Sequence, residues 1–293
     1  MSLSIFTNAS SMASTNAMNK SNNLLSTAME RLGTGKRINS AADDAAGLQI
    51  ATRLTGQTNG MAVAQRNISD ATALLQTSEG AFDEVSNIMY RMKDLATQAA
   101  NDTNTQKDRD AINSELNDLN SELGNIMNNT SYAGDKLFGA SGKFANALNF
   151  QIGSSTDETM TVDLSKELKG ASGGLTNGSG QFSQIQKLAN GSGSLEITSA
   201  SGAKALMTAL ENTLDEVGAV RSKMGASINR LSHTAANLAN MKDNTDLALG
   251  NIRDADYATE ASTMTRNQLL AQTSMSMLKQ SNSMSSMVMS LLG

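Results

Sequence analysis

Few residues of this chain could perform catalytic or metal chemistry. The sequence has one histidine, His233, and no cysteine. A lone histidine is more often a surface or packed residue than a catalyst, and without cysteine a metal site would need carboxylates. We interpret the acidic pair Asp43–Asp44 as a capping feature, because no histidine or second acidic cluster stands near it in sequence. No phosphate-binding loop, dinucleotide fingerprint or HExxH motif is present. The sequence therefore predicts no catalytic, cofactor-binding or metal site, and no enzyme.

The composition favours helices that pack along narrow seams. Hydrophobic residues make up 39% of the 293 residues, but aromatic residues only 3%, and there are 18 methionines and no proline. Such side chains suit helix–helix contacts better than a thick globular core, and the lack of proline permits uninterrupted helices. The formal net charge of −5 argues against nucleic acid as the main partner.

No membrane or secretory segment is expected. Residues 1–20 lack the basic and apolar regions of a secretory signal peptide, and nowhere do about 18 apolar residues run together. We predict no membrane partner.

A heptad pattern runs from Met61 to Ala99 and predicts the longest helix. Apolar residues recur every seven positions in two columns offset by three, which is typical of a helix with one narrow seam. The columns are Met61, Ile68, Leu75, Phe82, Met89, Ala96 and Ala64, Ala71, Ser78, Val85, Met92, Ala99.

Four other segments read as helices. Residues 105–128 and about 203–240 carry strong apolar seams, whereas the two chain ends carry weak ones. The N-terminal stripe is Phe6, Ala9, Ala13, Ala17, Leu24, Ala28, Leu32, and the C-terminal seam is Tyr257, Ala261, Met264, Gln268, Ala271, Met275, Leu278, Asn282, Ser285, Met289, Leu292. Because such thin stripes barely hold a helix alone, we expect residues 4–33 to become ordered only against a partner.

The segments between these helices read as turns, short strands and a loop. Gly33 and Gly35 should end the first helix, and Asn39 or Ser40 should cap the next. NFQIG (149–153) and MTVDL (160–164) predict a β-hairpin, and the nearby phenylalanines Phe138, Phe144, Phe150 and Phe182 predict a small satellite core. Residues 169–203 are rich in Gly, Ser and Asn and read as loop, with one short strand at LEITS (195–199).

These elements predict a mainly α fold: a long antiparallel helical bundle or coiled coil with a small β-hairpin region. The simplest packing pairs the N- and C-terminal helices as a second, thinner coiled coil. Terminal segments that are marginal alone become stable if many copies pack them together, which is a physical argument for a polymer.

The two ends of the chain also carry a family resemblance. ERLGTGKRINSAADDAAGLQI (30–50), NIRDADYATEASTMTRNQLL (251–270) and the closing SLLG resemble bacterial flagellin, the subunit of the flagellar filament. The resemblance covers roughly residues 1–165 and 203–293. The small insert between them resembles short flagellins without large outer domains, a class that includes lateral filaments.

The resemblance implies a domain plan and a set of partners. Residues 1–44 plus 251–293 would form the inner tube, 45–165 plus 203–250 the outer wall with its β region at 132–165, and 166–202 a variable insert. The implied function is polymerisation into a secreted, extracellular filament for motility. The implied partners are other copies of the chain, the flagellar type III export apparatus, an export chaperone, and the filament cap and hook-junction proteins.

Two groups of site residues follow from this reading. Leu24, Leu269, Leu278 and Leu292 are predicted as buried tube contacts, and the segment Arg31–Asp44, with Asp43 and Asp44, as the junction of tube and wall. The family surface for the Toll-like flagellin receptor maps to Arg91, Leu95 and Glu115, with Tyr90 where stimulatory flagellins usually have glutamine and Asp94 in place of a glutamate.

Two other functions compete with the filament subunit. A hook–filament junction protein of the same superfamily would share the terminal helices, but the DYATE segment (256–260) and the chain length favour the filament subunit. A secreted immune ligand or adhesin would find little support in a Gly/Ser insert without aromatic or charged clusters.

Overall fold

The computed structural model describes residues 8–138, 142–165 and 197–292, and from 285 onward only the backbone. The described chain is mainly helical, as predicted. Its long helices are α1 (Ala9–Thr34), α2 (Ala45–Ala99), α3 (Gln106–Asn129), α6 (Ala200–Arg253) and α7 (Tyr257–Leu292). No helix in the described ranges is long and apolar enough to cross a membrane.

The chain divides into two compact units. Unit 1 comprises residues 1–58 and 243–293, and unit 2 comprises residues 59–242, so α2 and α6 each contribute to both. The sequence reading placed its tube–wall boundaries at 44/45 and 250/251, and the assignment of tube and wall stays a prediction.

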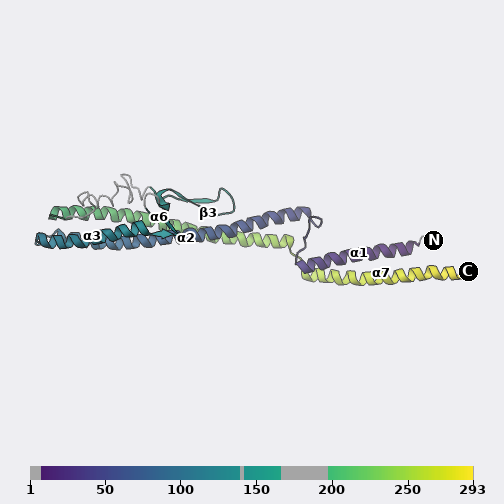
Figure 1. Ribbon diagram of the computed structural model, residues 1–293. Helices are drawn as coiled ribbons and strands as arrows, with labels where there is room; N and C mark the ends of the chain where they lie inside the picture. Colours follow the sequence, from purple (N-terminus) through teal and green to yellow (C-terminus); the bar gives the residue numbers. More distant parts are fainter. Residues whose placement is uncertain (1–7, 139–141, 166–196, 293) are drawn as a thin grey trace. The chain divides into compact units, whose positions relative to one another are not determined.

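Unit 2 is a bundle of α2, α3 and α6, which lie lengthwise beside one another (Figure 1). The heptad prediction for α2 is confirmed, because all twelve positions of the two columns are buried, from Met61 at 1% exposed to Ala99 at 0%. Ser78, the one hydroxyl in the columns, donates a hydrogen bond to the Leu74 carbonyl at 2.8 Å, so its polar group is satisfied inside the seam.

Helix α3 begins at a capping box. The Thr105 hydroxyl accepts a hydrogen bond from the backbone N–H of Asp108, and the Asp108 carboxylate accepts one from the backbone N–H of Thr105 at 2.9 Å. The Thr105 hydroxyl also donates to the Asp108 carboxylate at 2.7 Å, and this bond, followed by the one from the Thr105 N–H, lowers the pKa of Asp108. Ile112, Leu116 and Leu123 of α3 are buried against the bundle, as their spacing predicted.

The predicted hairpin is confirmed: β3 (Leu148–Gln151) pairs antiparallel with β4 (Thr159–Val162). A second, shorter hairpin of β1 (Ser131–Tyr132) and β2 (Asp135–Lys136) was not predicted. Its turn holds Ala133 at φ 53° and Gly134 at φ 88°. Two-residue hairpin turns favour positive φ at both central positions, and alanine rarely adopts it, so the sequence signal was weak.

The prediction of a separate aromatic core was wrong. Phe138 packs edge-to-face on Phe82 of α2, with ring centroids 4.9 Å apart, and stacks on Phe144 at 5.9 Å. Phe138 and Phe144 therefore belong to the main core of unit 2, and Phe150 packs against it. Phe182 lies outside the described residues, as do Leu195 and Glu196 of the LEITS segment, and the described residues 197–199 form no strand. The described end of that segment is held by Asn113, whose side-chain amide bonds both the N–H and the carbonyl of Ile197.

The start of α2 also differs from the sequence reading. Neither Asn39 nor Ser40 caps this helix. Asp44 caps it, because its carboxylate accepts a hydrogen bond from the Gly47 N–H at 2.8 Å. Asp43 instead closes the preceding turn by accepting bonds from the N–H groups of Ser40 and Asn39. Gly35 ends α1 at φ 70°, a left-handed conformation suited to glycine.

Candidate assembly surface

Helices α1 and α7 of unit 1 lie side by side and antiparallel (Figure 1). At one end, the Asn8 amide donates to the Ser281 hydroxyl at 2.9 Å. At the other, the Arg31 guanidinium pairs with Glu260 at 3.0 Å, and the Tyr257 hydroxyl donates to the Leu32 carbonyl at 3.1 Å. The prediction that the terminal helices pair is thus confirmed for this chain.

The seam between α1 and α7 is made largely of small and polar residues. Its buried members are Ser21, Ala28 and Asn267. On α7, the residues turned toward the seam recur every seven positions as Glu260, Asn267, Ser274, Ser281 and as Met264, Ala271, Leu278. This seam buries little apolar surface within one chain.

The sequence predicted only part of this seam. Met264, Ala271 and Leu278 face it as predicted, and Tyr257 and Asn282, although exposed, reach α1 through hydrogen bonds to Leu32 and Ser11. Ala261, Gln268 and Met275 are exposed, because the second column of the true seam is polar. On α1, Ala28 and Leu32 were placed correctly, whereas Ala13, Ala17 and Leu24 are exposed. Apolar periodicity cannot reveal a column of Glu, Asn and Ser, so the predicted stripe was rotated on both helices.

Large apolar side chains lie on the solvent-facing surfaces of these helices. Eight of them are between 45% and 60% exposed, and we call them the exposed apolar set: Met12, Leu24, Met29, Leu269, Leu270, Met275, Met277, Met284. Leu270, Met277 and Met284 are spaced by seven residues, so they form one column along α7. Scattered exposed apolar residues are ordinary, but a column along a helix marks an interaction surface.

The predicted contact residues fall into three groups. Leu24 and Leu269 belong to the exposed apolar set, and Leu278 is half-buried in the seam. The side chain of Leu292 lies outside the described residues. The sequence reading did not single out Leu270, Met277 and Met284 as a column, although their heptad spacing is visible in the sequence.

The segment 35–44 is bound to the linker between α6 and α7. The Ala255 N–H donates to the Gly35 carbonyl at 3.0 Å, and the Arg37 N–H donates to the Arg253 carbonyl at 2.7 Å. The Arg37 guanidinium adds a bond to the Ile252 carbonyl at 2.7 Å. Ile38, 2% exposed, is buried in the same region. Residues at opposite ends of the sequence therefore form one hydrogen-bonded clasp within unit 1.

The carboxylates of this clasp work as hydrogen-bond acceptors. Bonds from the backbone N–H groups of Ser40 and Asn39 lower the pKa of Asp43. Asp256 caps α7, and the bonds from the Thr259 hydroxyl and from the backbone N–H groups of Ala258 and Thr259 lower its pKa. These groups stay ionised at neutral pH and shape the backbone, which is a structural role.

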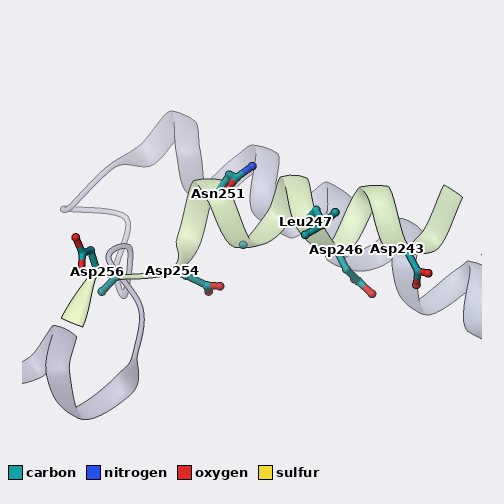
Figure 2. A pocket seen from close by; sticks show the side chains of 8 residues that line it. Asp243, Asp246, Leu247, Asn251, Asp254 and Asp256 are labelled. Carbon is teal, nitrogen blue, oxygen red and sulfur yellow. The ribbon is translucent and has the colours of Figure 1, made fainter. Parts of the chain in front are cut away.

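An open groove of about 780 Å³ lies along the end of α6 (Figure 2). It is lined by Asp243, Asp246, Leu247, Gly250, Asn251, Asp254, Ala255 and Asp256. Within the described residues, no group of three or more His, Cys, Asp or Glu side chains could hold a metal ion. The groove is therefore a negatively charged surface beside the clasp, with Leu247 68% exposed on it.

Comparisons with known proteins decide the family. The profile of the bacterial flagellin N-terminal helical region matches residues 5–143, and that of the C-terminal helical region matches residues 207–292. This chain belongs to the bacterial flagellin family. It is 32% identical to polar flagellin C of Vibrio parahaemolyticus and 32% identical to flagellin A of Vibrio anguillarum, with all of each chain covered.

Two solved structures are similar to this chain, and the one with the higher TM-score shares its fold. The structure of a flagellar hook-associated protein from Vibrio parahaemolyticus is 20% identical, covers 72% of this chain and 100% of its own, and gives a TM-score of 0.60. A Bacillus cereus flagellin is 28% identical over 59% of this chain and 88% of its own, with a TM-score of 0.46. Flagellins are structural subunits of the extracellular flagellar filament and not enzymes, so the chain is a filament subunit.

Two of the three residues of the predicted receptor surface come together in unit 2. The Arg91 guanidinium bonds one oxygen of Glu115 through two nitrogens, at 2.6 and 3.0 Å, and both side chains are about half exposed. Leu95 does not join them at the surface, because it is 3% exposed and belongs to the core. Tyr90, which precedes Arg91 in the sequence, is exposed. The receptor surface itself stays a prediction.

Proposed function

We propose that this flagellin polymerises through the outward surfaces of α1 and α7, with the exposed apolar set as the contacts between subunits. The observation that supports the proposal is that the inward and outward surfaces of these helices differ in composition. The fully buried residues between α1 and α7 are small or polar, with Met264 and Leu278 only half-buried beside them, while the eight large apolar residues of the exposed set face solvent. A helix pair that exposes large apolar side chains to solvent gains stability when neighbouring subunits cover those side chains.

The burial energy of the exposed apolar set is comparable to the cost of association. Fully burying a Leu or Met side chain contributes about 1.5–3 kcal/mol, so covering one that is half exposed contributes roughly 1 kcal/mol. The eight residues of the set then contribute about 8 kcal/mol per subunit when all neighbours are in place. Association costs about 4–15 kcal/mol, so contacts of unit 2 should add to those of α1 and α7 in a durable polymer.

Because the chain belongs to the flagellin family, we extend the proposal to the proteins that export and assemble it. We infer that the chain is exported by the flagellar type III apparatus with an export chaperone, and that it assembles below a filament cap on hook-junction proteins. Arg91 and Glu115, paired and exposed, support a contact of the Toll-like flagellin receptor on unit 2.

Polymerisation of the purified chain tests the proposed function. A precipitating salt such as ammonium sulfate strengthens apolar burial and should convert the chain into long uniform tubes, seen by sedimentation and electron microscopy. Removal of residues 1–30, or of residues 264–293, should abolish the tubes. A chain that stays monomeric, or stops at a compact oligomer, would contradict the filament function and favour a junction protein or a soluble ligand.

A further inference from the structure

The described methionines include a fully buried population and a strongly exposed one. In unit 2, Met61, Met89, Met92 and Met224 are 0% or 1% exposed inside the bundle. Among the described side chains of unit 1, five methionines are between 50% and 60% exposed: Met12, Met29, Met275, Met277, Met284. All five belong to the exposed apolar set, so the most exposed of these described thioethers stand on the proposed contact surface.

An exposed thioether reacts with peroxides. The sulfur lone pair attacks one peroxide oxygen, the S–O bond forms as the O–O bond breaks, and the departing hydroxide takes the remaining proton to give water. The sulfur is oxidised by two electrons and the peroxide is reduced. The product, methionine sulfoxide, is polar and is reversible by sulfoxide reductases. Methionines that solvent does not reach are protected from this reaction in the folded chain.

We propose that Met12, Met29, Met275, Met277 and Met284 form an oxidation-sensitive switch through which peroxide blocks assembly of the free subunit. The proposal rests on the proposed function of α1 and α7 as assembly surfaces. A sulfoxide that a neighbouring subunit covers with apolar side chains loses its hydrogen bonds to water without gaining new ones. Met277 and Met284 share one column with Leu270, so two sulfoxides there would place two polar groups along a single contact line.

The first step of the test maps the reaction. The full chain, as free subunit, is treated with hydrogen peroxide and its peptides are followed by mass spectrometry. Met12, Met29, Met275, Met277 and Met284 should convert to sulfoxide well before Met61, Met89, Met92 and Met224. Met241 of unit 2, 39% exposed, should also react and provides an internal reference outside the set. Equal rates across both populations would overturn the proposal.

The second step measures assembly. Oxidised subunits should need at least about a tenfold higher concentration for salt-induced tube formation, and treatment with methionine sulfoxide reductases should restore the original value. A variant with all five methionines replaced by leucine keeps volume and apolarity and should assemble equally well before and after peroxide. The matched control Met241→Leu should remain sensitive.

The outcomes separate this switch from the function on which it rests. Untreated wild type that forms no tubes would contradict the proposed function, and the switch with it. Untreated wild type that assembles, with oxidised wild type assembling equally well, would overturn the switch alone. Loss of assembly in the oxidised five-leucine variant would also overturn it, because the damage would then lie elsewhere in the chain.

Discussion

At Gly47 the first turn of α2 leaves no room for a side chain. A Cβ there would collide with the Asp44 carboxylate and lie 2.7 Å from Cδ1 of the buried Ile38. Gly47→Ala should therefore displace Asp44, which caps α2, and Ile38, which packs in the clasp. The substitution should lower the free energy of unfolding by about 1–3 kcal/mol. The loss is measured as faster amide hydrogen exchange in the first turns of α2, in the assembled protein.

The control is Gly56→Ala in the same helix, where a Cβ would meet nothing within 4 Å. Alanine there should stabilise the helix by about 1 kcal/mol, because it is the better helix former. Equal effects of the two substitutions would show that Gly47 is not constrained by Asp44 and Ile38.

The capping box of α3 should make unit 2 sensitive to acid. The hydrogen bonds from Thr105 lower the pKa of Asp108 in the folded chain, so the folded state favours the ionised form. This stabilisation is fully present above the ordinary carboxyl pKa of about 3.9 and is lost as pH falls through the lower folded value. Asp108→Ala should therefore lower Tm at pH 7. It should leave Tm unchanged at a pH below the folded pKa of Asp108, where the carboxylate is protonated in both states.

Circular dichroism melts of wild type and Asp108→Ala across this pH range test the assignment. Asp118→Ala removes the same charge from an exposed position on α3 and should change Tm little at any pH. A Tm difference between wild type and Asp108→Ala that stays constant down to the lowest pH would rule out the carboxylate as its source.

At the scale of elements, the sequence predicted strong seams well and weak seams poorly. The columns of α2 are apolar except at Ser78, and every position is buried as predicted. On α7 the seam uses Glu260, Asn267, Ser274 and Ser281, which carry no apolar signal, so the rule that apolar residues face inward selected the wrong column. The same rule holds at Leu95, an apolar residue that is buried in the bundle although the family resemblance maps it to the receptor surface.

The column on α7 predicts an effect on assembly without an effect on folding. Leu270→Asn and Met277→Gln replace solvent-facing apolar groups, so the structure of the single chain should be unchanged. Each should weaken subunit association by roughly 1 kcal/mol, a severalfold rise in the concentration needed for tubes. Sedimentation across a concentration series measures the change.

The control for these variants is Gln272→Ala, an exposed polar position on the same helix. It should leave the concentration dependence unchanged. If Leu270→Asn assembled at the same concentration as wild type, the column on α7 would not contribute to the contacts between subunits.

At the scale of the whole molecule, the two ends of the sequence belong to the same unit: unit 1 is built from both ends, and unit 2 from the middle. The sequence predicted this plan because the weak and strong helices occur in mirror order. It did not predict the clasp, in which residues 35–37 bond residues 252–255 through the backbone, because backbone hydrogen bonds leave no pattern of side-chain types. The mutual support of the two chain ends explains how helices with such thin seams are held together.

The central claim is that the exposed apolar set becomes the contact between subunits, and a helical reconstruction of the assembled filament by electron cryomicroscopy tests it most directly. The account predicts that Leu24, Leu269, Leu270 and Met277 are covered by side chains of neighbouring copies, while the seam of Ser21, Ala28 and Asn267 stays within one chain. A filament in which these apolar residues face solvent, with its contacts made by unit 2 alone, would contradict the account.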